Sequence, residues 1–242
     1  MEQPPSSDEP RPDRGGDPAS APARAREPAP PTVPAATFAF AAAAVAVLAG
    51  GLVLASSGVA GPWPWAVAGA SVLVIALVAW RLHTEQVLTD LVRYRPGDVL
   101  RGGATGALVF AACAAIVHGI VPTVPALSRD LATLDPAVAV VGRNLAFVAA
   151  LAVGVAQQLL MRGLVHRAIA SRAGAARAVA ITAVVEALVW LASGHPALVI
   201  LALLVGVGCG VLQVRSGRVL PSLLAHAMVV FLLSTFPVHG PR

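Results

Sequence analysis

The chain has 242 residues, of which 57% are hydrophobic and only 12% are charged. Soluble globular domains carry roughly 25% charged residues, so this composition excludes an ordinary soluble domain. The net charge of +5 comes entirely from arginine, and the arginines beyond the amino-terminal segment fall mainly between apolar blocks. Such a distribution is typical of a membrane topology signal and not of a nucleic-acid surface. The expected partner is therefore the lipid bilayer, with no nucleic acid.

The first 34 residues are rich in Pro, Ala, Asp, Glu and Arg and nearly lack large apolar side chains. Such a segment cannot bury enough apolar surface to offset the entropy of ordering. Residues 1–34 are therefore predicted to be a disordered cytoplasmic tail. The first apolar block begins too late for a cleavable signal peptide, which indicates a retained signal anchor.

Seven apolar blocks follow, each near the ~20 residues that a membrane-spanning helix needs. The predicted spans are residues 36–57, 63–80, 104–121, 137–169, 178–193, 197–214 and 219–236. The expected fold class is an all-α polytopic membrane helix bundle. Residues 35–136 would form three accessory transmembrane helices, and residues 137–242 a core of four.

The positions of the arginines predict the orientation of these spans. With the amino terminus in the cytoplasm, the arginines of the tail and of residues 81–101, 162–177 and 215–218 all face inward. Only Arg129, Arg143 and Arg242 then face outward, as the positive-inside rule requires. The predicted location is the plasma membrane of a bacterium, with the carboxyl terminus outside.

The polar residues inside the predicted spans gather in the last four, namely Gln157, Gln158, Arg162, Glu186, His195 and His226. Each is costly in lipid and should face the interior of the bundle. Simpler interpretations exist for single residues: His195 directly precedes Pro196 and would be an interfacial cap or a packing residue, and His118 in the third span would be a hydrogen-bonded bundle residue. Cys113 and Cys209 lie in apolar blocks and are expected to be small buried hydrophobic residues.

The order of these polar residues resembles a known family. The stretches "AQQLLMRGLVHR", "EALVWLASGHP" and "LLVGVGCGVLQVRSGRVLPSLLAHAMVV" lie within residues 145–231. They resemble the core of the CPBP intramembrane protease family, which includes Rce1-type CAAX prenyl proteases and bacteriocin-immunity proteins. The family's first motif is two glutamates, three residues, an arginine and a glycine, and those places are held here by Gln157, Gln158, Arg162 and Gly163.

The second motif, a phenylalanine followed four residues later by a histidine, is matched by Leu191 and His195, with Trp190 one residue before the aromatic position. The third, a histidine followed four residues later by an asparagine, falls on His226 and Val230. The resemblance implies a membrane-embedded endopeptidase. In it, the first glutamate and the second-motif histidine activate water, and the third-motif histidine and asparagine stabilise the oxyanion.

The residues at these places fit that chemistry only in part. The amide oxygen of glutamine has negligible basicity, so Gln157 can position a water molecule but cannot take its proton. Val230 has no side-chain donor, and loss of one oxyanion donor commonly lowers turnover ~100- to 1000-fold. Zinc is implied only by the resemblance, because His195 and His226 supply two ligands where a catalytic zinc usually has three. Glu186 precedes His195 by nine residues, which places the two on opposite faces of a helix.

Glu186 is the only carboxylate in the last four predicted spans, and Arg162 needs an anion. In the family a glutamate stands four residues before the arginine, but Gln158 carries no charge. An uncompensated arginine near the bilayer centre costs ~2.5 to 3.5 kcal/mol on insertion scales, so Glu186 is expected to pair with Arg162. At ~1.5 Å per residue these two residues and His226 share one level, whereas Gln157 and His195 lie deeper. In the alternative, Arg162 marks the helix end and Glu186 contacts water.

Three functions remain open from the sequence. The first is a CPBP-family protein that has lost peptidase chemistry and binds a membrane peptide or protein client. The second is an active intramembrane endopeptidase that processes CAAX-type or other membrane peptides with Glu186, His195 and His226. The third is a small permease that uses the polar layer as a path.

Overall fold

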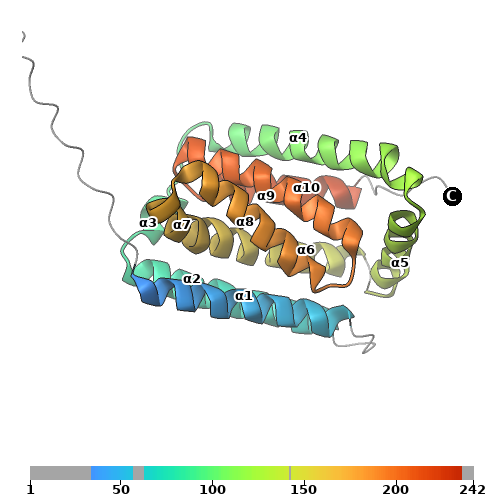
Figure 1. The fold of residues 1–242 in the computed structure, drawn as a ribbon, viewed down its shortest axis with the longest axis horizontal. Coiled ribbons are helices and arrows are strands. Elements are labelled where there is room, and N and C mark those ends of the chain that lie inside the picture. The colour runs from blue at the N-terminus through green and yellow to red at the C-terminus, as the bar shows by residue number, and fades with distance from the viewer. Residues whose placement is uncertain (1–33, 57–62, 142, 236–242) are drawn as a thin grey trace, which may run out of the picture. The chain divides into compact units, whose positions relative to one another are not determined.

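The computed structural model describes residues 34–56, 63–141 and 143–235, and the predicted tail lies outside these ranges except for its last residue. All regular secondary structure within the described ranges is helical. In chain order (Figure 1) the elements are α1 (Ala35–Ser56), α2 (Trp63–Thr84), α3 (Leu88–Val92), α4 (Asp98–Gly119), the 3-10 turn η2 (Val121–Thr123), α5 (Pro125–Val141), α6 (Arg143–Gln158), the π-helical segment η3 (Leu159–Val165), α7 (His166–Ala173), α8 (Ala175–Leu191), α9 (Pro196–Ser216) and α10 (Leu220–Thr235).

Within the described ranges each predicted apolar span is mainly helical, and from Arg143 onward the fourth is a continuous run from α6 through η3 to α7. By length and composition, three helical stretches can cross a membrane: Asp98–Thr123, Ala146–Ala173 and Pro196–Ser216. The shorter apolar helices are Ala36–Gly50, Gly69–Thr84 and Leu220–Leu233. These helices are those of an integral membrane protein in contact with lipid, and the count of seven spans stays a prediction.

Two segments expected to be loops are helical, namely α3 and α5. The fourth span is predicted to begin at residue 137, but α5 continues to Val141 and α6 begins only at Arg143. The difference arises because α5 mixes Arg129, Asp130 and Asp135 with its apolar residues, so it does not form an apolar block. In Figure 1, α5 runs across the direction of the long helices, and it contacts α6 and α9.

The long helices pack in pairs around two apolar clusters. α1 and α2 form a hairpin that lies against α6 and η3, and one cluster fills the space among these elements and α8. The second cluster joins α4, α9 and α10. α4 and α10 run parallel and approach closely at glycines: a Cβ on Gly106 would lie 2.5 Å from the carbonyl oxygen of Ala225. Polar side chains of α6, η3, α8 and α10 meet in the bundle, together with a backbone carbonyl group of α9.

Single residues outside this polar group follow the expectations only in part. Cys113 and Cys209 are buried and form no disulfide, as expected for small hydrophobic residues. His118 is expected inside the bundle but is exposed. The reason is the register of α4, which buries the face that carries Val109, Cys113 and Val117 and turns His118 outward.

Polar contacts at one end of the bundle connect segments that are distant in the sequence. Asp98 at the start of α4 accepts two hydrogen bonds from Arg218, with Nη1–Oδ2 at 2.6 Å and Nη2–Oδ1 at 2.7 Å. Arg218 also donates to the carbonyl oxygen of Arg93 at 2.8 Å. At the same end, Glu85 of α2 contacts Thr37 of α1 and Arg167 of α7. These contacts fix the connections between the helices.

Candidate functional site

The residues at the first-motif places lie where the fourth span changes its helical form. α6 ends at Gln158, and the next residues, Leu159–Val165, form the π-helical segment η3, with Arg162 at its middle. π-helical turns are rare and often occur at functional sites. Both Gln158 and Arg162 reach the same residue of α8, which is Glu186.

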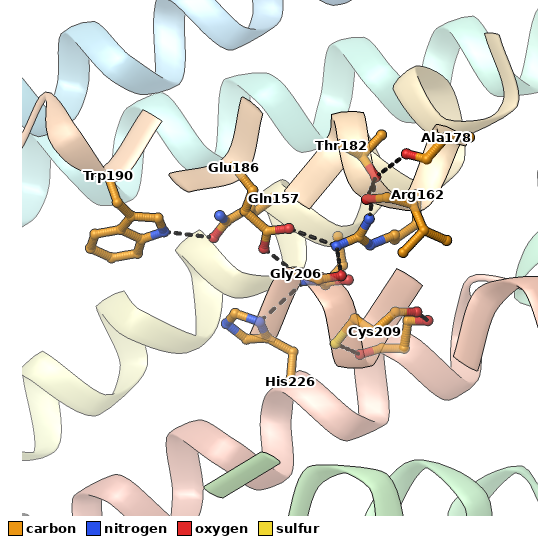
Figure 2. Close-up of polar contacts among 12 residues, drawn as sticks. Gln157, Arg162, Ala178, Thr182, Glu186, Trp190, Gly206, Cys209 and His226 are labelled. Atoms are coloured by element: carbon orange, nitrogen blue, oxygen red, sulfur yellow. Dashed lines mark hydrogen bonds and ion pairs between the residues drawn. The ribbon is translucent and has the colours of Figure 1, made fainter. Parts of the chain in front are cut away.

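Arg162 is the centre of the buried polar group, and Figure 2 shows it between Thr182 and Glu186. Its Nη2 donates to Glu186 Oε2 at 2.7 Å and to the carbonyl oxygen of Gly206, and its Nη1 donates to Thr182 Oγ1 at 2.7 Å. Arg162 and Glu186 are both 0% exposed. The ion pair that the charge argument predicts is therefore present. One guanidinium connects η3 to α8 and α9.

Gln158 connects this ion pair to His226 on α10. Its Nε2 donates to Glu186 Oε1 at 3.4 Å and lies 3.2 Å from His226 Nδ1. With the amide in this orientation, Nδ1 of His226 accepts the hydrogen bond and the ring proton lies on Nε2. The imidazole fits only because residue 154 is glycine, since a Cβ there would overlap Cδ2 of His226. Gln158, Arg162, Glu186 and His226 thus form one network.

Gln157 lies beside this network and faces a different partner. Its Oε1 accepts a hydrogen bond from the indole Nε1 of Trp190 at 3.3 Å, as Figure 2 shows. Its own Nε2 and the Oε1 of Gln158 are buried and have no hydrogen-bond partner among the described residues. Buried polar atoms of this kind usually have a partner, so these two atoms call for a water molecule or a ligand.

The structure does not bring His195 to the network. His195 precedes α9, and its Nδ1 lies 2.8 Å from Oδ1 of Asp130 on α5. The other oxygen of Asp130 accepts the backbone N–H of Ala197 at 2.9 Å. Asp130 therefore caps the amino end of α9, and His195 lies in a helix-capping contact, the simpler interpretation of that residue.

The donors present do not fit a zinc ion. Within the described ranges no group of three or more His, Cys, Asp or Glu side chains is placed to hold a metal. Catalytic zinc usually has three protein ligands. The two histidines at motif places contact different partners, Asp130 for His195 and Gln158 for His226.

Sequence reasoning misses two residues of this region. In the motif comparison, Trp190 appears only as an aromatic residue one position before Leu191. A large aromatic side chain two helical turns after Thr182 could have indicated that this face of α8 is buried. Asp130 carries no such signal, because its segment is expected to be a loop. Its nearness to His195 depends on how α5 folds across the bundle end, which the local sequence does not indicate.

The architecture is that of a helical integral membrane protein with a buried polar network among its carboxyl-terminal helices. Residues 140–232 match the family model described as type II CAAX prenyl endopeptidase Rce1-like. This segment covers every member of the network, and over it the chain is similar to the Rce1-like family. No curated protein and no solved structure matches the chain.

Proposed function

We propose that this Rce1-like protein has lost peptidase chemistry and acts by binding a membrane peptide or protein. The observation that carries the proposal is the state of Glu186. Its Oε2 accepts a hydrogen bond from Arg162 and its Oε1 accepts one from Gln158, and the side chain is fully buried. A general base must lie within reach of the proton that it removes, whereas this carboxylate is directed at its ion-pair partner and at an amide. Glu186 instead replaces the charge that Gln158 lacks.

The contact between Gln157 and Trp190 supports the same conclusion. The residue of α8 that faces the first-motif position is Trp190, and Glu186 stands four residues before it, the same spacing as the aromatic residue and histidine of the second motif. Leu191, which the sequence spacing puts at the aromatic position, is 53% exposed. We therefore assign the second motif to Glu186 and Trp190 in place of Leu191 and His195.

With this assignment only His226 keeps a catalytic residue type at its family place. Gln157 and Trp190 cannot accept a proton from water at neutral pH, and Val230 cannot donate a side-chain hydrogen bond to an oxyanion. Client binding is supported by the two atoms without partners, Nε2 of Gln157 and Oε1 of Gln158. A peptide amide carries one acceptor and one donor and would satisfy both.

Three further features belong to the proposal. Residues 137–242 form the family core and residues 35–136 an accessory part, which the match over residues 140–232 supports. The amino terminus faces the cytoplasm of a bacterial cell, in line with the positions of the arginines. Reporter fusions after Arg172 should therefore read as cytoplasmic, and a fusion after Pro125 as external.

The peptidase question is tested with the purified full chain in liposomes and a prenylated CAAX peptide. The unmodified chain should leave the peptide intact by mass spectrometry, while a photoreactive version of the peptide should crosslink to it and be displaced by unlabelled peptide. Cleavage by the unmodified chain that disappears in Glu186→Gln would contradict the proposal and identify Glu186 as the base.

A matched pair of variants tests the assignment of the second motif. Gln157→Glu with Trp190→His and Val230→Asn supplies the family's first glutamate, second-motif histidine and third-motif asparagine beside His226. Gln157→Glu with Val230→Asn relies on His195 instead. Any gain of cleavage should appear in the first variant and not in the second, and the opposite result would return His195 to the site.

A further inference from the structure

The loop before α4 and the first turn of α4 together expose a mixture of basic and apolar side chains. Within residues 92–101, termed the basic loop, Arg93, Arg95 and Arg101 are exposed. Between them, Tyr94 is 61% exposed and Leu100 is 75% exposed. The loop stands at the amino end of the apolar stretch Asp98–Thr123, where a membrane span would meet the headgroup region.

Hydrogen bonds from buried residues fix the backbone of the basic loop. Arg218 binds both oxygens of Asp98 and the carbonyl oxygen of Arg93, and the N–H of Arg95 donates to Asp98 Oδ2 at 2.8 Å. The N–H of Val219 donates to the carbonyl oxygen of Leu91 at 2.9 Å. Because the charge of Asp98 is matched by Arg218, it does not offset the charge of the exposed arginines.

The same end of the bundle carries more positive charge. Arg172 at the end of α7, Arg177 at the start of α8 and Arg215 at the end of α9 are all exposed. Among the described residues of this end, Asp90 is the exposed carboxylate. Trp80, one turn before the end of α2, is 60% exposed, as is typical of an aromatic anchor at a membrane interface. The end as a whole is basic, with aromatic and aliphatic groups beside the charges.

We propose that the basic loop binds the anionic headgroups of phospholipids. A nucleic acid or an acidic protein would account for the arginines but not for the exposed Val99 and Leu100 between them, which a bilayer can bury beneath the headgroups. Each basic side chain near an anionic surface favours binding by about fivefold. The fixed backbone means that the arginines lose little conformational freedom when they bind phosphate. The inference does not depend on the proposed function.

In the test, the purified full chain is incubated in mixed micelles that contain phosphatidylglycerol and phosphatidylcholine and is then transferred to detergent without lipid. Native mass spectrometry then counts the lipid molecules of each kind that stay bound to the protein. The unmodified chain should retain the anionic lipid preferentially, and added salt should weaken the preference. The triple variant Arg93→Gln, Arg95→Gln, Arg101→Gln should lose the preference by about tenfold or more.

Arg129→Gln is the matched control, because Arg129 is an exposed arginine on α5 at the other end of the long helices. It should keep the preference for anionic lipid. Equal retention of both lipids by the unmodified chain, or an equal loss in the control and the triple variant, would overturn the proposal. If the triple variant does not fold, the single variants Arg93→Gln and Arg95→Gln replace it, and each should lower the preference.

Discussion

Two buried pairs of arginine and carboxylate can be compared within this one chain. At the bundle end, Asp98 binds Arg218 through both of its oxygens and also accepts the backbone N–H of Arg95. In the middle of the bundle, Glu186 gives one oxygen to Arg162 and the other to Gln158. The carboxylate of Asp98 therefore binds one side chain and the backbone of one loop. The carboxylate of Glu186 binds two side chains of the same helical run, α6 and η3.

The difference reflects what each pair holds. The Asp98 pair fixes loop backbone, since Arg218 and Asp98 each also contact the main chain of residues 93–95. The Glu186 pair holds helices together, because Arg162 also reaches Thr182 on α8 and the carbonyl oxygen of Gly206 on α9. Identical chemical groups thus serve loop geometry at one place and helix assembly at the other.

The largest expected effect comes from breaking the interior pair from one side. Glu186→Gln and Arg162→Gln should each lower the free energy of unfolding by ~3 to 5 kcal/mol, because each leaves an uncompensated charge in a fully buried position. The double variant should recover a substantial part of that loss. Thermal unfolding of the purified proteins measures the coupling, and purely additive single effects would contradict it.

A carboxylate exchange sharpens this result. Gln158→Glu combined with Glu186→Gln returns the negative charge to the place where the family has its second glutamate, four residues before Arg162. This variant should be more stable than Glu186→Gln alone in the same thermal unfolding measurement. Equal stability of the two would mean that a carboxylate at residue 158 cannot reach the guanidinium.

Substitutions in the pair of Asp98 and Arg218 at the bundle end should lower the free energy of unfolding less than those in the interior pair. Asp98→Asn or Arg218→Gln should cost ~1.5 to 3 kcal/mol, the usual value for hydrogen bonds to charged groups, because water can reach a helix end more easily than the bundle centre. The loop before α4 should also become more susceptible to proteolysis. A loss as large as that of Glu186→Gln would mean that the two pairs do not differ as described.

The smallest expected effect tests the connection from the interior pair to His226. Gly154→Ala places a methyl group where it overlaps Cδ2 of the imidazole and should destabilise the protein by ~1 to 3 kcal/mol through overpacking. Gly69→Ala is the matched control, because a Cβ there meets nothing within 4 Å. The control should be neutral or slightly stabilising in thermal unfolding. Equal behaviour of the two variants would mean that His226 can move away from Gln158 at no cost.

The features that could be predicted from the sequence are those that follow from the cost of placing polar groups in lipid. Apolar blocks coincide with helices because backbone groups in lipid must form hydrogen bonds within the chain. Arg162 pairs with Glu186 because an unpaired arginine is costly in lipid. Features that depend on three-dimensional packing escape such reasoning. The contact between Asp98 and Arg218 joins residues 120 apart, and nothing in the local sequence indicates it. The contact between Trp190 and Gln157 depends on the rotation of α8, which an almost uniformly apolar helix does not reveal.

The position of Arg162 also bears on how the protein enters the membrane. The chain is synthesised from its amino terminus, so the helix that carries this arginine leaves the ribosome before Glu186, which follows 24 residues later, and before Gly206, which follows 44 residues later. Until those residues emerge, the guanidinium has none of its final partners on α8 and α9 and must keep contact with water or headgroups. We therefore expect full integration of this helix to follow the emergence of α8 and α9, so that the three helices insert into the bilayer together.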